Sequence, residues 1–336
     1  MSTMTPTSSP LAAPSTVQDP SPLCAVCHAA TRPVSRLWDD RYGYPGVYEL
    51  LHCAACGHRS LATRMSADQI SDLYTRYYPR SSFDVEAWSP PREEPALRTW
   101  WRGLRASAFR WVPPNVRVLD IGCGFGESLG YHRQRGCDAH GVEADRNILR
   151  VAQRHGLNVK VGLFDPDQYE PASFDVVTLD QVIEHVSQPA QVLRGVHRVL
   201  KPGGMLVLST PNADGWGARL FGRRWIHWHA PYHVQFFSRA SMAALARDCG
   251  FALEQRTTVT NSAWLDFQWC HLATYPPAGK PSVYWGSPVG RTFGQKVALR
   301  LLRVPDRMGF NVLVTRLMDG LGWGDNVVQV LRRGRD

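Results

Sequence analysis

The sequence predicts an α/β protein in which a doubly wound, mostly parallel seven-stranded sheet follows a small zinc-ribbon-like module. Three observations lead to this prediction. Two Cys-x-x-C pairs occur within residues 24–56, a glycine-rich turn follows a short apolar run at 122–126, and apolar runs then alternate with helical stretches. Such alternation is typical of βαβ units that build a parallel sheet. The 336 residues, 44% of them hydrophobic, are enough for one large domain or two of ordinary size.

Residues 1–23 are expected to form a disordered tail. The segment is rich in Ser, Thr and Pro, and Asp19 is its only charged residue, so it cannot bury enough apolar surface to offset its chain entropy. It lacks the basic start and apolar run of a signal peptide, and no later stretch reaches the ~18 apolar residues of a spanning helix. We therefore expect a cytoplasmic protein, whose paired cysteines hold metal more often than they form disulfides.

The two Cys-x-x-C pairs predict a structural zinc site in a module that spans residues 24–62. Four thiolates complete a tetrahedral set and leave no position for a substrate, so the metal would serve folding. The metal ligands are expected to be Cys24, Cys27, Cys53 and Cys56. A hairpin loop at 39–46 would absorb the long spacing between the pairs. A redox pair or ordinary core thiols are the alternatives, and a neighbouring histidine could replace one thiolate. These histidines are His28, His52 and His58.

Residues 63–115 are expected to form a helical linker, and residues 116–336 form the main domain. Strands are expected at 116–121, 138–142, 158–164, 174–179, 205–210, 251–259 and 326–332. Helices are expected at 127–135, 147–155, 189–200 and 241–249. Glycine or a Lys-Pro-Gly-Gly turn follows several of these helices, as at helix ends generally. An insertion at about 262–322, with a helical stretch at 295–302, separates the last two strands.

The turn after the first strand predicts a nucleotide-cofactor loop. It reads Asp120-Ile121-Gly122-Cys123-Gly124-Phe125-Gly126. Glycines accept positive φ and let the backbone approach a ligand closely. Glu143 ends the second strand, where a carboxylate can accept the two hydroxyls of a ribose. The alternative for Glu143 alone is a solvated charge at a strand end. The turn lacks the glycine spacing of the dinucleotide fingerprint G-x-G-x-x-G.

Together with four later motifs, this turn resembles the class I S-adenosylmethionine-dependent methyltransferases over about residues 116–260. The motifs are Phe174-Asp175-Val176-Val177, Glu184-His185-Val186, Leu200-Lys201-Pro202-Gly203-Gly204 and Ser209-Thr210-Pro211-Asn212. The resemblance implies a Rossmann-like methyltransferase fold and S-adenosylmethionine as cofactor. It also implies that Asp120 and the turn backbone hold the methionine end and that Glu143 holds the ribose. The implied cofactor-binding set is Asp120, Gly122, Cys123, Gly124, Gly126, Glu143, Asp165 and Asp180.

One position departs from the family pattern. Leu163 stands after the third strand, where the family often has the aspartate that meets the adenine amine. Asp165 or Asp167 would then substitute for it.

The N-terminal part resembles a bacterial subgroup of this family that carries an N-terminal zinc-binding module. The resemblance rests on the cysteine pairs and on Leu73-Tyr74-Thr75-Arg76-Tyr77-Tyr78. Some members of the subgroup methylate sugars or secondary metabolites, which implies a small-molecule acceptor, with sugars and natural products as candidates. The zinc module and the net charge of +9 favour RNA methylation as an alternative, although residues 1–115 show no dense basic patch with interleaved aromatics. The other alternative is a non-catalytic cofactor-fold binding module.

The acceptor pocket is expected at the 216–237 loop, because loops at the carboxyl ends of the strands line the ligand crevice, and at the insertion, which the core fold does not require. The loop at 216–237 is dense in aromatics and histidines, and its alternative role is a lid packed on the core. A hydroxyl acceptor requires a general base, and histidine suits this role near neutral pH. The candidates are His185, after the fourth strand, and His233, in the loop. The basic helical stretch near 295–302 either packs on its own domain or makes a peripheral membrane contact.

Overall fold

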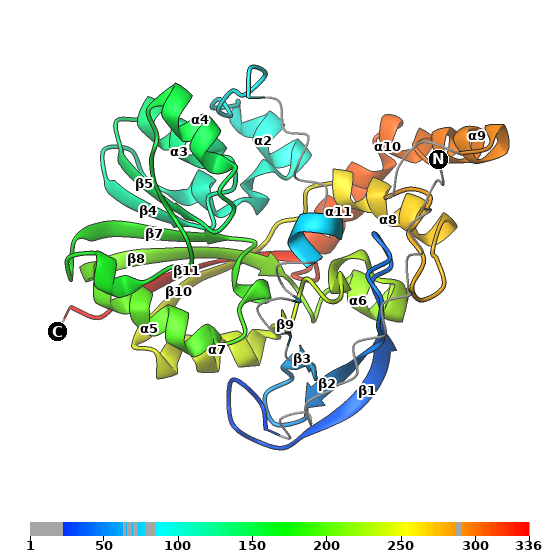
Figure 1. Ribbon diagram of the computed structural model, residues 1–336, viewed down its shortest axis with the longest axis horizontal. Helices are drawn as coiled ribbons and strands as arrows, with labels where there is room; N and C mark the ends of the chain where they lie inside the picture. The colour runs from blue at the N-terminus through cyan, green and yellow to red at the C-terminus, as the bar shows by residue number, and fades with distance from the viewer. Residues whose placement is uncertain are drawn as a thin grey trace, which may run out of the picture.

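The computed structural model describes residues 23–62, 65, 69, 73–77, 85–285 and 291–335. The predicted disordered tail lies outside these residues except for Leu23. Two β-sheets organise the described chain: a seven-stranded sheet in the main domain and a four-stranded sheet near the N-terminus (Figure 1). All eight cysteines lie in the described ranges, and none of them forms a disulfide bond.

The seven-stranded sheet has the predicted doubly wound architecture. Its strands are β4 (Arg117–Ile121), β5 (Asp138–Glu143), β6 (Asn158–Val161), β7 (Phe174–Asp180), β8 (Leu200–Pro211), β10 (Phe251–Thr258) and β11 (Asn326–Arg333). Their order is β10-β11-β8-β7-β4-β5-β6. Strands β4 to β8 pair in parallel, and β11 runs antiparallel to β8 and β10. The prediction was wrong about the start of β8, because Leu200 already pairs with Phe174.

Four helices cover the two faces of this sheet. They are α3 (Glu127–Gln134), α4 (Ile148–His155), α5 (Pro189–Val199) and α7 (Arg239–Asp248). Figure 1 shows α3 and α4 on one side and α5 and α7 on the other. Successive strand residues point to opposite faces, so Val118 joins the core under α3 and α4 while Leu119 joins the core under α5 and α7. Short apolar runs without alternation thus mark strands that are buried on both faces.

The N-terminal sheet contains a strand from the main domain. Its strands are β1 (Thr31–Leu37), β2 (Tyr48–Cys53), β3 (Arg59–Leu61) and β9 (Gln235–Phe236), in the order β1-β2-β3-β9. All neighbours are antiparallel, and β9 pairs Phe236 with Arg59. The cysteine-bearing segment and the 216–237 loop therefore share one sheet, and Figure 1 shows β9 beside β3. The boundary expected at residue 62 remains a prediction.

Short helical segments fill the remaining chain. The described part of 63–115 contains η1 (Leu73–Tyr77), α2 (Ala96–Arg102), η2 (Leu104–Ala106) and η3 (Ala108–Trp111). The loop at 216–237 contains α6 (Trp216–Phe221), η6 (Gly222–Arg224) and η7 (Ile226–Trp228). The insertion contains α8 (Ala263–Ala273), α9 (Phe293–Leu301), α10 (Val304–Arg307) and α11 (Phe310–Gly320), and η4 (Pro166–Gln168) and η5 (Ile183–His185) follow β6 and β7. In the described chain, no helix has the length and apolar character needed to cross a membrane.

Helices α9 to α11 leave large apolar side chains exposed. The most exposed of them are Phe293, Met308, Leu301, Leu313 and Leu317. Basic side chains of α9, Lys296 and Arg300, lie among them in sequence. The exposure is compatible with the predicted peripheral membrane contact, which stays a prediction.

Candidate active site and cysteine cluster

The glycine turn joins β4 to α3 at the carboxyl edge of the sheet. Gly122, Gly124 and Gly126 have φ of 74°, 57° and 80°, so all three use the left-handed region that side chains disfavour. A Cβ at Gly122 would lie 2.5 Å from Val182 Cγ2, and one at Gly126 would lie 2.6 Å from Leu157 Cδ1. At Gly124, apart from its own residue and its two chain neighbours, no described atom lies within 4 Å of that position. The turn is therefore packed at both ends and open in its middle, which fits a loop that a cofactor approaches closely.

Glu143, at the end of β5, is buried and fixes this turn. Its Oε2 accepts a hydrogen bond from Gly124 N at 2.8 Å, and its Oε1 accepts one from Asp145 N at 2.9 Å. Each carboxylate oxygen can accept more than one hydrogen bond, so these contacts are compatible with ribose hydroxyls as further donors. The predicted cofactor turn and the predicted ribose acid thus lie in direct contact. Their roles in binding stay predictions.

Asp120 is buried beneath the turn and faces the protein interior. Thr178 Oγ1 donates to its Oδ1 at 2.6 Å, and Ser128 Oγ donates to its Oδ2. Burial raises the pKa of Asp120 to about 7, and these two hydrogen bonds offset only part of that effect. Asp120 therefore ties β4 to β7 and to α3. Sequence reasoning missed both hydroxyl partners, because their contact depends on the register of strands that are distant in sequence.

The remaining predicted cofactor residues have different surroundings. Cys123 is buried, and a Cβ at Gly141 would lie 2.7 Å from its Sγ, so its side chain packs on β5. Asp165 is exposed and caps η4 through Asp167 N at 3.0 Å. Asp180, at the end of β7, accepts a hydrogen bond from Ser209 Oγ, and burial raises its pKa. The adenine-binding role of Asp165 stays a prediction.

The two predicted catalytic histidines lie together beyond the end of β7. The ring centroids of His185 and His233 are 4.6 Å apart, and the rings are nearly perpendicular. His185 Nδ1 lies 2.8 Å from the Tyr232 carbonyl oxygen, and His233 Nδ1 lies 2.9 Å from the His227 carbonyl oxygen. Because a carbonyl only accepts, each Nδ1 carries a proton and donates it to that carbonyl. Burial lowers the pKa of His233 well below its usual range, and the nearby His185 adds to this, so His233 is neutral.

Glu184, which the sequence motif does not by itself mark as a site residue, lies beside these two histidines. It is 1% exposed, and Thr210 Oγ1 donates to its Oε2 at 3.1 Å. Burial raises the pKa of Glu184 to about 8. One ligand-type atom from each of Glu184, His185 and His233 lies within 4.8 Å of the other two.

Most aromatic side chains of the 216–237 loop are core residues, in agreement with the lid alternative. Trp225, Trp228, Tyr232 and Phe236 are at most 5% exposed. They form one hydrophobic cluster with residues of the N-terminal sheet. The cluster partners include Leu37, Tyr44, Tyr48, Leu50 and Leu61. The loop therefore positions His233 through a packed aromatic core.

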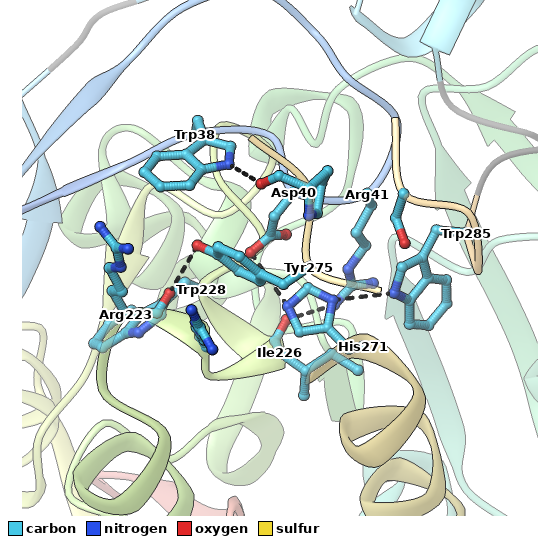
Figure 2. Close-up of polar contacts among 12 residues, drawn as sticks. Trp38, Asp40, Arg41, Arg223, Ile226, Trp228, His271, Tyr275 and Trp285 are labelled. Atoms are coloured by element: carbon cyan, nitrogen blue, oxygen red, sulfur yellow. Dashed lines mark hydrogen bonds and ion pairs between the residues drawn. The ribbon is translucent and has the colours of Figure 1, made fainter. Parts of the chain in front are cut away.

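The N-terminal segment also contacts the insertion, as Figure 2 shows. Asp40 Oδ2 lies 3.3 Å from His271 Nε2 of α8, and both side chains are buried. The Arg41 guanidinium donates to the Ile226 carbonyl oxygen at 2.5 Å and lies 4.5 Å from the Trp285 ring centroid. Three segments that are distant in sequence therefore meet in one assembly: residues 38–41, the 216–237 loop and the insertion.

The four predicted metal ligands converge in a compact cluster. All four Sγ atoms lie within 4.8 Å of one another. The Sγ atoms of Cys24 and Cys56 are 3.6 Å apart, and those of Cys27 and Cys53 are 3.5 Å apart. Zinc at ~2.3 Å from each thiolate would place sulfurs about 3.8 Å apart, so the cluster fits a tetrahedral zinc ion. Of the neighbouring histidines, His58 directs Nε2 to Gln235 Oε1 at 2.7 Å.

The strand order and the glycine turn define a class I methyltransferase fold. A family model described as "Methyltransferase domain" matches residues 75–256. The chain therefore belongs to the class I S-adenosylmethionine-dependent methyltransferases and is an enzyme of this kind.

Three curated relatives that are similar to this chain share one name. The "Ubiquinone biosynthesis O-methyltransferase" of Thiobacillus denitrificans is 31% identical over 206 residues, which cover 57% of this chain and 84% of that one. Its counterpart from Ralstonia nicotianae is 32% identical over 198 residues, covering 54% and 79%. The Pseudomonas aeruginosa protein of the same name is 41% identical over 149 residues, covering 42% of this chain and 60% of that one.

Proposed function

We propose that the protein transfers a methyl group from S-adenosylmethionine to a hydroxyl oxygen of a small molecule. The observation that carries this proposal is the convergence of His185 and His233 beside the glycine turn. Val182, just before η5, packs against Gly122, so the segment that carries His185 borders the turn directly. The names of the relatives, which are O-methyltransferases, support oxygen as the accepting atom.

The chain's own residues would bind, orient and receive a proton. S-adenosylmethionine, held by the 122–126 turn and Glu143, would supply an electrophilic methyl carbon to the acceptor oxygen, with the cofactor sulfur as the leaving group. The hydroxyl proton passes to His185 Nε2, whose ring is held by the Tyr232 carbonyl. His185 is half-buried, whereas His233 is buried, so His185 is the base that an acceptor can reach. His233 orients that ring by packing against it.

The small-molecule acceptor belongs to the same proposal, with sugars and natural products as the candidate classes. RNA methylation stays an untested alternative. The alternative of a non-catalytic cofactor-fold binding module is set aside, because the chain belongs to a family of enzymes. We also propose that the four cysteines hold one structural zinc ion. Its support is the spacing of the four sulfur atoms. A cytoplasmic location and a peripheral membrane contact remain expectations.

The test uses the full chain with S-adenosylmethionine and two hydroxylated probes, a dihydroxybenzoate and a nucleotide-linked deoxysugar. Calorimetry measures cofactor binding, and mass spectrometry locates the methyl group on any product. We expect binding of S-adenosylmethionine and methylation at oxygen. Failure to bind the cofactor, or a product methylated at nitrogen or carbon, would contradict the proposal.

A further inference from the structure

Residues 85–93, which we term the strap, lie against α3 and α4 without forming a helix or a strand. Near one end, Glu86 Oε2 lies 2.5 Å from Arg154 Nη2 of α4. At the other end, Glu93 Oε1 lies 2.8 Å from Arg135 Nε, just beyond α3. The strap therefore spans the two helices that follow β4 and β5, and between its ends it contacts α3 and the glycine turn.

Trp88 joins the strap to the glycine turn. Its Nε1 donates a hydrogen bond to the Phe125 carbonyl oxygen at 2.9 Å. Its ring centroid lies 4.2 Å from that of His155, at the end of α4. Trp88 and Phe125 also pack against the same hydrophobic cluster. The indole is therefore held by packing, and its single N–H donor is directed at the backbone of the turn.

The turn is held at two successive residues by different elements. Glu143 of β5 accepts a hydrogen bond from Gly124 N, and Trp88 donates one to the carbonyl of the next residue, Phe125. Glycine loses more conformational freedom on ordering than any other residue, so a turn with three glycines is costly to fix. A turn that is already fixed before the ligand arrives avoids this cost during binding. The contact from Trp88 therefore favours cofactor affinity.

Gly130 of α3 lets the strap approach this closely. A Cβ at Gly130 would lie 2.6 Å from Pro90 Cβ and 2.9 Å from Trp88 Cη2, nearer than non-bonded carbon atoms pack. The proline ring is rigid, so the strap would have to move away from the helix. Alanine is otherwise preferred to glycine within a helix. The glycine therefore serves the contact with the strap and not the stability of α3.

The charged ends of the strap contribute less to its position. The side chains of Glu86 and Glu93 are 69% and 68% exposed. Ion pairs that are open to solvent contribute little to stability, because water screens them. Trp88 and Pro90 are partly buried, so they are the residues that fix the strap against α3 and the turn.

We propose that Trp88 is a positioning residue for the cofactor. Through the Phe125 carbonyl, it holds the 122–126 turn in the conformation that binds S-adenosylmethionine. This inference rests on the cofactor role of the turn in the proposed function. Trp88 acts through the backbone of the turn and not by touching the cofactor, and Gly130 allows the indole to reach it.

The first test removes the donor and keeps an aromatic ring. Full-length Trp88→Phe is titrated with S-adenosylmethionine by calorimetry, and urea unfolding measures its stability. The matched control is Trp111→Phe, because Trp111 packs against the same cluster and donates Nε1–H to the Arg105 carbonyl at 2.8 Å, away from the turn. We expect binding about three- to tenfold weaker in Trp88→Phe, as for the loss of one hydrogen bond, and a change under about twofold in Trp111→Phe. Equal weakening in both variants would overturn the proposal.

Gly130→Ala tests the same contact and leaves Trp88 and the turn unchanged in sequence. The added Cβ displaces the strap while alanine favours the helix, so cofactor binding should weaken although α3 is no less stable. Gly294→Ala in α9 is the control, because no described atom outside its own helix backbone and chain neighbours lies within 4 Å of that Cβ position.

The double variant of Trp88→Phe and Gly130→Ala shows whether the two changes act through one contact. It should bind the cofactor no more than about twofold more weakly than the weaker single variant, because both changes remove the same interaction. Losses that multiply would show two separate effects and contradict the shared contact. If Trp88→Phe does not fold, Gly130→Ala alone still tests the displacement of the strap.

Amide hydrogen exchange measures the turn in the absence of cofactor. In the free protein, Trp88→Phe should speed exchange in the peptide that contains residues 122–126 and leave the peptide that contains β7 unchanged. Trp111→Phe should leave the turn peptide unchanged. A merely structural role for Trp88 would instead speed exchange in the strands of the sheet as well.

These measurements separate the positioning role from the proposed function. If the unmodified chain does not bind S-adenosylmethionine, the proposed function fails, and hydrogen exchange decides whether Trp88 holds the turn. If the unmodified chain binds the cofactor, and Trp88→Phe and Gly130→Ala bind it equally well with unchanged exchange in the turn, the positioning role is overturned and the proposed function stands.

Discussion

The cofactor half and the acceptor half of this molecule are built from contacts of very different range. The cofactor half comprises β4 to β7 with α3 and α4, and its key contacts join neighbouring elements, as Glu143 joins Gly124. The acceptor half comprises the N-terminal sheet, the 216–237 loop and the insertion. Its contacts cross most of the chain, as in Arg41 to Ile226 and Ser238 to Cys56. We therefore expect a substitution in one half to impair that half alone. Loss of cofactor binding should not disturb the acceptor side, and damage to the acceptor side should not weaken cofactor binding.

The largest expected effect comes from breaking the cysteine cluster. Cys27→Ser should lose one zinc ion and lower the free energy of unfolding by several kcal/mol, because binding of a structural zinc contributes on the order of 10 kcal/mol. Turnover should be lost as well, since β9 and the loop that carries His233 pair with this segment. Metal analysis and thermal unfolding measure the change. Cys137→Ser is the control, a buried thiol outside the cluster that should keep the zinc.

The second prediction concerns pH and the cofactor half alone. Burial raises the pKa of Asp120 from 3.8 to about 7, so the folded chain holds this proton more tightly than the unfolded chain does. The stability from Asp120 is fully present below about pH 3.8 and is lost as pH rises through about 7, at ~1.4 kcal/mol per pKa unit. Asp120→Asn should flatten the pH dependence in this window, measured by urea unfolding.

The control is Asp175→Asn, because the pKa of Asp175 is shifted in the opposite direction from that of Asp120. Despite partial burial, the hydrogen bonds from Lys201 and from Arg117 N hold the pKa of Asp175 below its usual range. Its stabilising effect is present at neutral pH and is lost as pH falls. A steeper pH dependence in Asp120→Asn would contradict the account of this buried carboxyl.

The third prediction concerns the carboxyl edge of the seven-stranded sheet, where Glu143 is expected to bind the cofactor. Glu143→Ala should weaken the binding of S-adenosylmethionine by about 1.5–3 kcal/mol, the usual contribution of hydrogen bonds to a charged group. The zinc content should not change, because Glu143 lies in the cofactor half. Asp138→Asn, at the other end of β5, is the matched control. Unchanged affinity in Glu143→Ala, measured by calorimetry, would remove Glu143 from the cofactor site.

The smallest effect is expected at the junction of the two halves. Ser238 caps α7 and also donates Oγ–H to the Cys56 carbonyl at 2.7 Å. Ser238→Ala should cost about 1–2 kcal/mol of stability through the lost cap and should weaken zinc retention against a chelator. Thr292→Ala removes a similar capping box at α9 but has no such contact, so it should leave zinc retention unchanged. Equal zinc retention in both variants would contradict this coupling.

The range of the contacts also explains what the sequence could predict. The glycine turn, Glu143 and the four cysteines follow from local patterns, because each marks a turn, a strand end or a metal hook. The pairing of β9 with β3 could not be predicted, since two residues carry too little strand signal to indicate a partner. Glu184 was missed as a site residue because its burial beside His233 depends on how the 216–237 loop folds back. Its position next to His185 was the only signal.

The central claim is that the cofactor half binds S-adenosylmethionine independently of the cysteine cluster. Its most direct test is a calorimetric titration of S-adenosylmethionine into Cys27→Ser beside the unmodified chain. We predict dissociation constants that agree within about threefold, which corresponds to ~0.6 kcal/mol. A loss of affinity greater than about tenfold, or ~1.4 kcal/mol, in the variant would contradict the claim and show that the two halves form one binding unit.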